Sequence, residues 1–490
     1  MTETGILAID LGSSSARASL WDGEGNPVED TETQISHEFR YIPDEGVVAD
    51  ADELVDLIAR AVDGTLEKAP DAPVRAVAIS TFWHSVLGVD SSGEPTTPVL
   101  TWADRRAAGA AAELRERLDE REAHRRTGCV LHSSYVPAKL LWLEGASREA
   151  FARTKRFVSP GEYLCLKLFG EARVSTSMAS ATGLLDQNRK TYDEEILEAL
   201  PIDDGRLSPI SDEPLRGLAG KWAERWPRLR DVPWFPAYGD GACSNVGAGC
   251  ANRDRLALMV GTSGAMRVLW KAESVEIPEG LWCYRSDPER FVMGGALSDG
   301  GNLIAWLSET LRLPELEEAE NAVAAMRPDA HGLTFLPLLA GERGPGWTEG
   351  ASGVVAGLSM GTKPEEILRA AMEAVALRFA LIAEILESSL PGERDVIATG
   401  GGMLNSPTWR QIMADALGRP VTVSRVEEAS SRGAALLALE ALGEIEDLEV
   451  VDAPHGETAH PDPACQETYR AALARQRRLY DATIEGFERG

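Results

Sequence analysis

The feature that most constrains the fold is an internal repeat. The segment 7–21 (LAIDLGSSSARASLW) aligns without gaps on the segment 256–270 (LALMVGTSGAMRVLW), with seven of fifteen positions identical. Each copy has an apolar strand, a turn of glycine and hydroxyl residues, and a returning strand, which is the pattern of a β-hairpin. Two such hairpins half a chain apart predict two structurally related domains.

Strand and helix patterns alternate in both halves of the chain. In the first half, helical apolar spacing over 51–62 precedes an alternating strand over 74–80. In the second half, a long amphipathic helix over 364–390 precedes a short strand at 396–399, and the Ser-Pro pair at 406–407 marks the start of another helix. This alternation predicts an α/β fold.

The chain of 490 residues is long enough for two or three domains of about 150 residues each. A stretch rich in tryptophan and proline, 222–236, lies between the two hairpins and indicates a connection. We therefore expect an N-terminal domain over residues 1–238 and a C-terminal domain over residues 239–490.

Composition excludes several classes of function. The 49 basic residues against 78 acidic residues give a formal net charge of −29, so a nucleic acid would meet net repulsion. No stretch reaches the ~18 apolar residues of a membrane span, and the N-terminus lacks the basic segment of a secretion signal. Six cysteines without CxxC spacing indicate neither a zinc site nor a disulfide framework. We expect a cytoplasmic protein with no nucleic-acid or membrane partner.

Both hairpin turns have the composition of a phosphate-binding loop. Gly12, Ser13 and Ser14 in the first turn, and Gly261 and Thr262 in the second, present backbone N–H groups and hydroxyls with little side-chain bulk. One such turn alone is most often just a hairpin. Two of them, facing each other across a cleft, would grip a nucleotide from both sides.

The two copies of the repeat differ at one chemically important position, where Met259 replaces Asp10. A carboxylate at the end of a strand beside a phosphate loop is suited to hold hydrated Mg²⁺, although Asp10 can also simply cap its turn. Arg17, on the returning strand, can neutralise a transferred phosphoryl group or be an ordinary surface arginine.

Asp240 lies between two glycines just upstream of the second hairpin. The glycines let a carboxylate approach a ligand closely, so Asp240 is placed to take a proton from a hydroxyl that attacks phosphorus. The alternative is a plain turn.

The three glycines at 400–402 resemble a dinucleotide-binding turn only superficially, because the GxGxxG spacing is missing. A nicotinamide site is therefore disfavoured. A turn without side chains more plausibly admits an adenine or its ribose.

Two segments of the first half, 82–85 and 101–106, together supply an imidazole, a carboxylate, guanidinium groups and two indoles. This mixture hydrogen-bonds and flanks a polyol. Alternatively, His84 is a structural histidine and Trp102 fills the core.

These motifs, in this order and spacing, resemble the FGGY family of carbohydrate kinases over nearly the whole chain. The motifs that carry the resemblance are 9–17, 102–106, 239–241, 261–264 and 400–406. The resemblance implies two ribonuclease-H-like domains of the actin-like ATPase superfamily flanking a catalytic cleft, which agrees with the internal repeat.

The resemblance also implies ATP and Mg²⁺ as cofactors and roles for the residues at matching positions. Asp10 matches the Mg²⁺-associated acid, Gly12, Ser13, Ser14 and Arg17 the first phosphate loop, Gly261 and Thr262 the second, Asp240 the catalytic base, and Gly401, Gly402 and Asn405 the adenosine-binding turn, while His84, Ser85, Trp102, Asp104 and Arg105 fall in the sugar-binding segments.

Within the family, five segments look most like gluconokinases, with xylulokinases next: 84–86, 101–105, 139–143, 341–343 and 409–415. This implies ATP-dependent phosphorylation of a terminal hydroxyl of an open-chain sugar or sugar acid, with D-gluconate to 6-phosphogluconate as the expected reaction. We expect Arg105 or His84 to meet the gluconate carboxylate. Trp83 stands where gluconokinases usually have methionine, and we expect it either to narrow the sugar pocket or to change the substrate.

Two alternatives stay open. One is a xylulokinase or another pentulose or polyol kinase. The other, from a different class, is an actin-like assembly protein or chaperone-type ATPase, which would not need His84 or the 102–105 segment. The expected partners are ATP and a small sugar or sugar acid. The sequence gives no oligomeric state, and a homodimer is left open.

Overall fold

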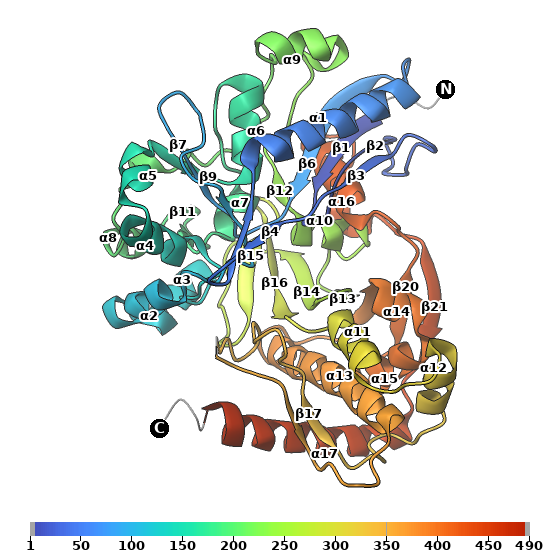
Figure 1. Cartoon of the computed structure of the whole chain (residues 1–490). Helices are drawn as coiled ribbons and strands as arrows, with labels where there is room; N and C mark the ends of the chain where they lie inside the picture. Colours follow the sequence, from blue (N-terminus) through green and yellow to red (C-terminus); the bar gives the residue numbers. More distant parts are fainter. Residues whose placement is uncertain (1–4, 349, 486–490) are drawn as a thin grey trace.

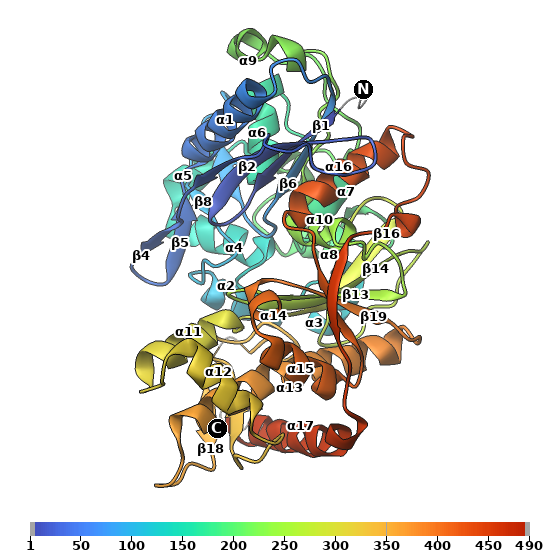
Figure 2. The same cartoon turned by 90° about the vertical axis from the view of Figure 1, so that its right-hand side faces the viewer.

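The computed structural model describes residues 5–348 and 350–485. Two β-sheets with helices packed on them form two domains, drawn one above the other in Figure 1 and turned by 90° in Figure 2. Each sheet contains one copy of the repeated hairpin.

The first sheet has five strands in the order β12-β6-β1-β2-β3. The strands are β1 (Gly5–Leu11), β2 (Ser15–Trp21), β3 (Thr33–Ser36), β6 (Val74–Thr81) and β12 (Tyr238–Gly239). Every residue of β1 is buried, as expected for a central strand covered on both faces.

The second sheet has seven strands in the order β15-β16-β14-β13-β19-β20-β21. The strands are β13 (Arg255–Val260), β14 (Gly264–Lys271), β15 (Trp282–Arg285), β16 (Arg290–Leu297), β19 (Asp395–Thr399), β20 (Val421–Ser424) and β21 (His455–Ala459).

The two sheets share one plan, which confirms the relation predicted from the repeat. In each sheet the hairpin pairs antiparallel, with Leu7 opposite Leu20 and Leu256 opposite Val268. In each sheet the first hairpin strand also has a parallel neighbour, β6 for β1 and β19 for β13. The order β3-β2-β1-β6-β12 therefore corresponds to β16-β14-β13-β19-β20.

Helices cover both sheets, and their ends follow local sequence signals. They include α1 (Ala51–Lys68), α6 (Pro160–Phe169), α10 (Asp240–Gly247) and α16 (Ala429–Ala441) around the first sheet, and α11 (Gly301–Thr310), α12 (Leu316–Ala324), α13 (Pro364–Ser389), α14 (Gly401–Asn405), α15 (Pro407–Leu417) and α17 (Gln466–Tyr480) around the second. The Ser406 side chain accepts a hydrogen bond from the backbone N–H of Trp409, so it caps α15 as the sequence predicts.

A third hydrophobic cluster lies beside the first sheet, within the N-terminal half. Its residues come mainly from β5 (Gly46–Ala49), β8 (Val99–Leu100), β9 (Arg156–Val158), α2 (Ala108–Arg117), α3 (Glu120–Thr127), α4 (Val136–Ala146), α5 (Arg148–Arg153) and α8 (Glu194–Glu198). The strand β4 (Arg40–Ile42) pairs with β5, and β7 (Leu87–Val89) pairs with β9. The remaining short elements are α7 (Thr176–Ser180), α9 (Gly220–Arg225), β10 (Leu185–Asp186), β11 (Thr191–Tyr192), β17 (Thr334–Leu336) and β18 (Val354–Ala356).

The tryptophans of the stretch 222–236 are buried in the first domain. Trp226 and Trp234 are fully buried and stack at 6.0 Å between ring centroids in the core of the first domain. The backbone N–H of Phe235 donates to the carbonyl of Val77 on β6. The three indoles of this stretch therefore belong to the first domain, while the boundary between residues 238 and 239 stays a prediction.

Helix α16 returns from the C-terminal half to the first sheet (Figures 1 and 2), where it packs on β1, β6 and α10. Glycines make this crossing close. A Cβ on Gly433 would lie 1.8 Å from the carbonyl oxygen of Cys243, and one on Gly247 would lie 1.8 Å from that of Ala429. The crossing of α10 and α16 thus joins the two domains at their interface.

Across the described residues, we find no helix that combines the length and the apolar character needed to cross a membrane.

Candidate active site

Three cavities lie where the two domains meet. The wide cavity, about 850 Å³, is bounded by the end of β1 and by the segments that follow β19 and β20. The inner cavity, about 240 Å³, lies between the two hairpins, and the cleft, about 750 Å³, adjoins it. The inner cavity and the cleft share Ser13, Trp102, Ser134, Ser263 and Arg343 in their walls.

The two hairpin turns face one common space. Both the inner cavity and the cleft are lined by Ser13, from the first turn, and by Ser263, from the second turn. The cleft is also lined by Ser14 and Thr262. The turns are closed by equivalent hydrogen bonds of 2.9 Å, from the Gly12 N–H to the Ser15 carbonyl and from the Gly261 N–H to the Ser263 carbonyl. The two turns therefore line a common space, as expected, and their role as phosphate loops stays a prediction.

The second turn is also anchored from behind. Its carbonyls at Gly261 and Thr262 accept hydrogen bonds from the N–H groups of Gly301 (2.7 Å) and Gly300 (3.2 Å), at the start of α11. Because these carbonyls are engaged, the turn is held in one conformation by the helix that follows.

Asp10, the penultimate residue of β1, lines the wide cavity. Its Oδ1 atom is buried and has no hydrogen-bond partner within the described residues, and burial raises its pKa. Arg17 Nη1 lies 3.7 Å from Asp10 Oδ2 and 3.4 Å from Glu428 Oε2, so it bridges the first hairpin and the start of α16. Burial raises the pKa of Glu428 to about 7.

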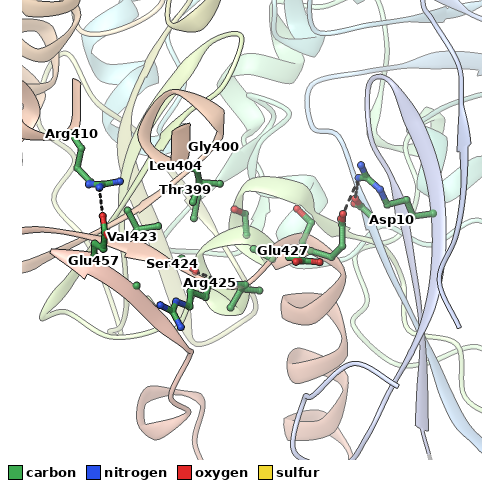
Figure 3. Close-up of a pocket in the computed structure, with 17 residues that line it drawn as sticks. Asp10, Thr399, Gly400, Leu404, Arg410, Val423, Ser424, Arg425, Glu427 and Glu457 are labelled. Carbon is green, nitrogen blue, oxygen red and sulfur yellow. Dashed lines mark hydrogen bonds and ion pairs between the residues drawn. The ribbon is translucent and has the colours of Figure 1, made fainter. Parts of the chain in front are cut away.

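The turn after β19 forms the opposite wall of the wide cavity. Figure 3 shows Thr399, Gly400 and Leu404 on that side, away from Asp10. Gly402 packs behind it, where a Cβ would lie 2.9 Å from Val260 and from the Trp409 ring. Gly401, Gly402 and Asn405 lie on the same short helix, α14. Direct contact of these residues with a nucleotide stays a prediction.

Asp240 begins α10 directly after β12 and lines the inner cavity. Burial, together with the negative charge of Asp10, raises its pKa to about 6. Its Oδ1 accepts a hydrogen bond of 2.7 Å from the Gly241 N–H. A carboxylate with this pKa can accept a proton at neutral pH more readily than an exposed aspartate can.

The glycines beside Asp240 are required by Trp83. A Cβ on Gly239 would lie 1.8 Å from the Trp83 indole, and one on Gly241 would lie 2.4 Å from the same ring. Trp83 also contacts Trp282 and Tyr284 and forms part of the wall of the inner cavity. Trp83 and Asp240 thus line the same cavity, and an effect of Trp83 on the width of the sugar pocket or on the substrate stays a prediction.

Of the five residues in the predicted sugar segments, His84 and Trp102 line the inner cavity. His84 Nδ1 lies 2.6 Å from the carbonyl oxygen of Ala181, so this nitrogen donates and Nε2 carries the free lone pair. Burial lowers the pKa of His84 to about 3. The ring is therefore neutral near pH 7 and can accept a hydrogen bond from a hydroxyl. It has no positive charge to attract a carboxylate, which disfavours the predicted contact of His84 with the gluconate carboxylate.

The other three residues lie elsewhere. Arg105 lines the cleft, with Nη1 3.8 Å from Glu45. Ser85 is buried and donates to the Trp83 carbonyl, and Asp104 is buried and binds Arg106 and the Val47 N–H. Ser85 and Asp104 support the walls of the site, and their direct contact with a sugar stays a prediction.

Several residues of the inner cavity were not predicted from their chemistry. Arg267 on β14 and Arg343 line it together with Tyr135 and Tyr284. The available signal for Arg267 was an arginine within an otherwise apolar hairpin strand. Lys139, fully buried on α4, donates to the carbonyls of His84 (2.5 Å) and Ser134 (2.7 Å) and thereby fixes two residues of the wall.

Comparison with known proteins agrees with this geometry. Models of the N-terminal and C-terminal domains of the FGGY family of carbohydrate kinases match residues 5–247 and 256–442. A gluconokinase from Bacillus subtilis is 29% identical over 475 residues, covering 94% of this chain and 91% of the relative. A xylulose kinase from Lactococcus lactis is 27% identical, covering 91% of this chain and 90% of the relative.

The solved structures give the same result. The crystal structure of gluconate kinase from Lactobacillus acidophilus has a TM-score of 0.90 to this chain at 26% identity, covering 99% of both chains. The fold is thus the two-domain, actin-like ATPase fold expected from the sequence. With both family models matched in order, the chain belongs to the FGGY family of carbohydrate kinases and is an ATP-dependent sugar kinase.

Proposed function

We propose that this kinase transfers the γ-phosphoryl group of ATP to the terminal hydroxyl of D-gluconate and forms 6-phosphogluconate. The observation that carries the proposal is the inner cavity, which combines Asp240, both hairpin turns and two arginines in about 240 Å³. The relatives named gluconokinase and gluconate kinase support the choice of substrate.

In this proposal Asp240 is the catalytic base. A terminal hydroxyl held in the inner cavity would give its proton to the Asp240 carboxylate as its oxygen attacks phosphorus. Phosphoryl transfer depends mainly on positioning and on stabilising the charge of the transferred group. Ser13 and Ser263, from opposite turns, stand on either side of the path along which that group would pass.

The wide cavity would hold ATP, with Mg²⁺ near Asp10. The residues fit such an ion, because Asp10 Oδ1 is a buried, unpartnered carboxylate oxygen and Mg²⁺ prefers oxygen ligands. Bound Mg²⁺ would neutralise phosphate charge. Arg17, held between Asp10 and Glu428, is placed to contribute a second positive charge.

The net charge of −29 does not oppose anionic substrates at this site, because the field that matters is local. Arg267 and Arg343 face the inner cavity, whose acidic side chain is Asp240. This local excess of positive charge favours a sugar acid over a neutral pentulose such as xylulose, which a relative of this chain is named for.

A coupled ADP-release assay over gluconate, xylulose, ribulose, glycerol and related polyols tests the proposal. We expect the highest kcat/KM with gluconate, a product with the mass of 6-phosphogluconate, and loss of activity when EDTA removes Mg²⁺. Higher kcat/KM with a neutral sugar would refute the gluconate assignment. ADP release that does not depend on any sugar, with ATP-driven polymerisation, would favour an assembly ATPase instead.

A further inference from the structure

Two arginines that line the inner cavity, Arg267 and Arg343, have no carboxylate ion-pair partner within the described residues. Neither the Arg267 nor the Arg343 guanidinium makes an ion pair with a carboxylate of the described residues within 4.0 Å. The Nε atom of each is buried without a hydrogen-bond partner, and burial lowers the pKa of both groups. A buried charge in this state is costly unless a ligand completes it.

The contrast with the rest of the molecule is direct. Arg290 pairs with Asp287 and Glu440, Arg369 with Glu373, and Arg378 with Glu342. Three further buried arginines without a carboxylate partner donate instead to two or three backbone carbonyls each: Arg285, Arg394 and Arg432. Within the described residues, the Arg267 guanidinium has neither kind of partner and the Arg343 guanidinium has a single carbonyl, and both line the inner cavity.

The two arginines differ in the residues that they contact. Arg267 is close to the base, since its Nη1 would lie 2.5 Å from a Cβ on Gly241, and its charge opposes the rise in the pKa of Asp240 more strongly than that of Arg343 does. Arg343 stacks on Trp102, 5.4 Å from the ring centroid, and its charge acts on His84. Arg343, unlike Arg267, also lines the cleft, together with Trp102.

Glu342, which precedes Arg343 in the sequence, does not form an ion pair with the Arg343 guanidinium, because both of its carboxylate oxygens have other partners. Glu342 Oε1 pairs with Arg378, and Glu342 Oε2 accepts a hydrogen bond of 2.5 Å from the Tyr480 hydroxyl. Of the Arg343 guanidinium nitrogens, Nη2 donates to the Leu297 carbonyl at 3.2 Å. The rest of the planar fork remains for a ligand, held in orientation by the Trp102 ring.

We propose that Arg343 binds the carboxylate of the substrate and makes the enzyme selective for a sugar acid. The inference rests on the proposed function, in which the terminal hydroxyl lies at Asp240. In an extended aldonate the carboxylate is at the other end of the carbon chain, which places it toward Arg343 and Trp102. This assignment replaces the expected carboxylate contact of His84, whose neutral ring offers an acceptor there, and of Arg105, which lies in the cleft.

The test is a substrate comparison with Arg343→Gln. Gluconate is compared with D-glucitol, in which a neutral CH₂OH replaces the carboxylate, and with xylulose. Loss of a charge-assisted hydrogen bond predicts a fall of about 10–100-fold in kcat/KM for gluconate, mainly through a higher KM, from a cost of about 1.5–3 kcal/mol. The kcat/KM for neutral substrates should change by less than about threefold. Arg343→Lys should retain part of the preference for gluconate, because it keeps the charge.

Matched controls separate a local effect from a general one. Arg477→Gln removes an exposed arginine on α17 and should leave all rates unchanged. Titration with ATP checks that the Arg343 variants are folded, and Arg343→Lys carries the test if Arg343→Gln does not fold. If the wild type has no measurable rate with neutral substrates, a lower kcat for gluconate at unchanged KM overturns the proposal.

The outcomes distinguish this inference from the proposed function. If gluconate is the best substrate but Arg343→Gln lowers activity on acidic and neutral substrates equally, the inference fails and the proposed function stands. If another sugar acid is the best substrate and Arg343→Gln selectively reduces activity on it, gluconate is the wrong substrate and the inference stands. A selective loss in Arg105→Gln or Arg267→Gln, with none in Arg343→Gln, overturns the assignment to Arg343.

Discussion

At the scale of single residues, the site uses burial to set the protonation of its groups. His84 and Asp240 line the same cavity, yet burial lowers the pKa of one to about 3 and raises the pKa of the other to about 6. In both cases desolvation disfavours the charged form. At neutral pH the imidazole is therefore a fixed neutral acceptor for a hydroxyl, and the carboxylate is charged but close to its titration point.

Asp240→Asn should reduce turnover by about 10²–10⁴-fold, because the amide cannot accept the hydroxyl proton. Affinity for ATP should stay close to that of the wild type, since Asp240 lines the inner cavity and not the wide cavity. ADP release and nucleotide titration measure the two effects. Activity near that of the wild type would refute the assignment of the base.

The same substitution should also stabilise the protein above pH 6. A carboxyl group whose folded pKa is raised binds protons more tightly when folded, so its favourable contribution is present at low pH and is lost as the pH rises from 3.8 through about 6. Asparagine avoids burying this charge. We expect the Tm of Asp240→Asn to exceed that of the wild type at pH 7.5 in the absence of Mg²⁺, with the difference shrinking toward pH 4. A constant difference across this range would contradict the raised pKa.

The pH dependence of catalysis follows from the same group. Only the ionised carboxylate accepts a proton, so kcat/KM for gluconate should fall about tenfold for each pH unit below about 6 and stay level above it. His84 should add no second limb between pH 4 and 9, because it remains neutral there. A rate profile measured with the Arg477→Gln enzyme as control checks this, and a limb near pH 6.5 lost in a His84 variant would contradict it.

At the scale of elements, the crossing of α10 and α16 positions the chemistry. Asp240 is the first residue of α10, and Glu428, which binds Arg17, directly precedes α16. Gly247 and Gly433 have no side chains, so the backbones of α10 and α16 come into direct contact. The catalytic base and one wall of the wide cavity are therefore held at the same helix crossing.

Gly433→Ala tests this helix crossing. The added methyl group would meet the Cys243 carbonyl oxygen, so we expect a loss of about 1–3 kcal/mol in the free energy of unfolding, with reduced turnover. Gly109→Ala on α2 is the matched control, because nothing lies within 4 Å of its added Cβ and the helix should gain up to about 1 kcal/mol. Denaturant unfolding of both variants measures the two changes in the free energy of unfolding. If Gly433→Ala is as stable as the wild type, the crossing of α10 and α16 accommodates the added methyl group and the prediction is wrong.

Elements specified by local signals could be predicted from the sequence, and those specified by distant contacts could not. The hairpins, the cap at Ser406 and the run that forms α13 depend on residues a few positions apart. The return of α16 to the first sheet depends on packing against strands some 350 to 420 residues earlier. Similarly, the missing counter-charge of Arg267 and Arg343 is a property of the assembled cavity, which no sequence spacing reveals.

At the scale of the whole molecule, the two domains are tied together on one side of the site. The hydroxyls of Tyr135 and Tyr284 lie 2.6 Å apart, and the Cys283 N–H donates to the Gly128 carbonyl at 3.1 Å. These contacts join β15 of the second sheet to the N-terminal half. Together with the crossing of α10 and α16 they act as fixed points, so relative motion of the domains should change the wide cavity and the cleft more than the inner cavity.

Such motion has a chemical purpose, because water competes with the sugar hydroxyl for the phosphoryl group. We expect the domains to close over bound gluconate and a non-hydrolysable ATP analogue with Mg²⁺, and therefore a smaller radius of gyration by small-angle X-ray scattering than for the free enzyme. Gluconate alone and nucleotide alone are the controls, and each should give a smaller change than the two together. Closure is expected because the two hairpin turns belong to different domains and must both approach the phosphates. Identical radii of gyration in all four states would contradict this prediction. They would mean that the free enzyme already has the domain arrangement needed for the reaction, so that domain closure does not exclude water from the phosphoryl group.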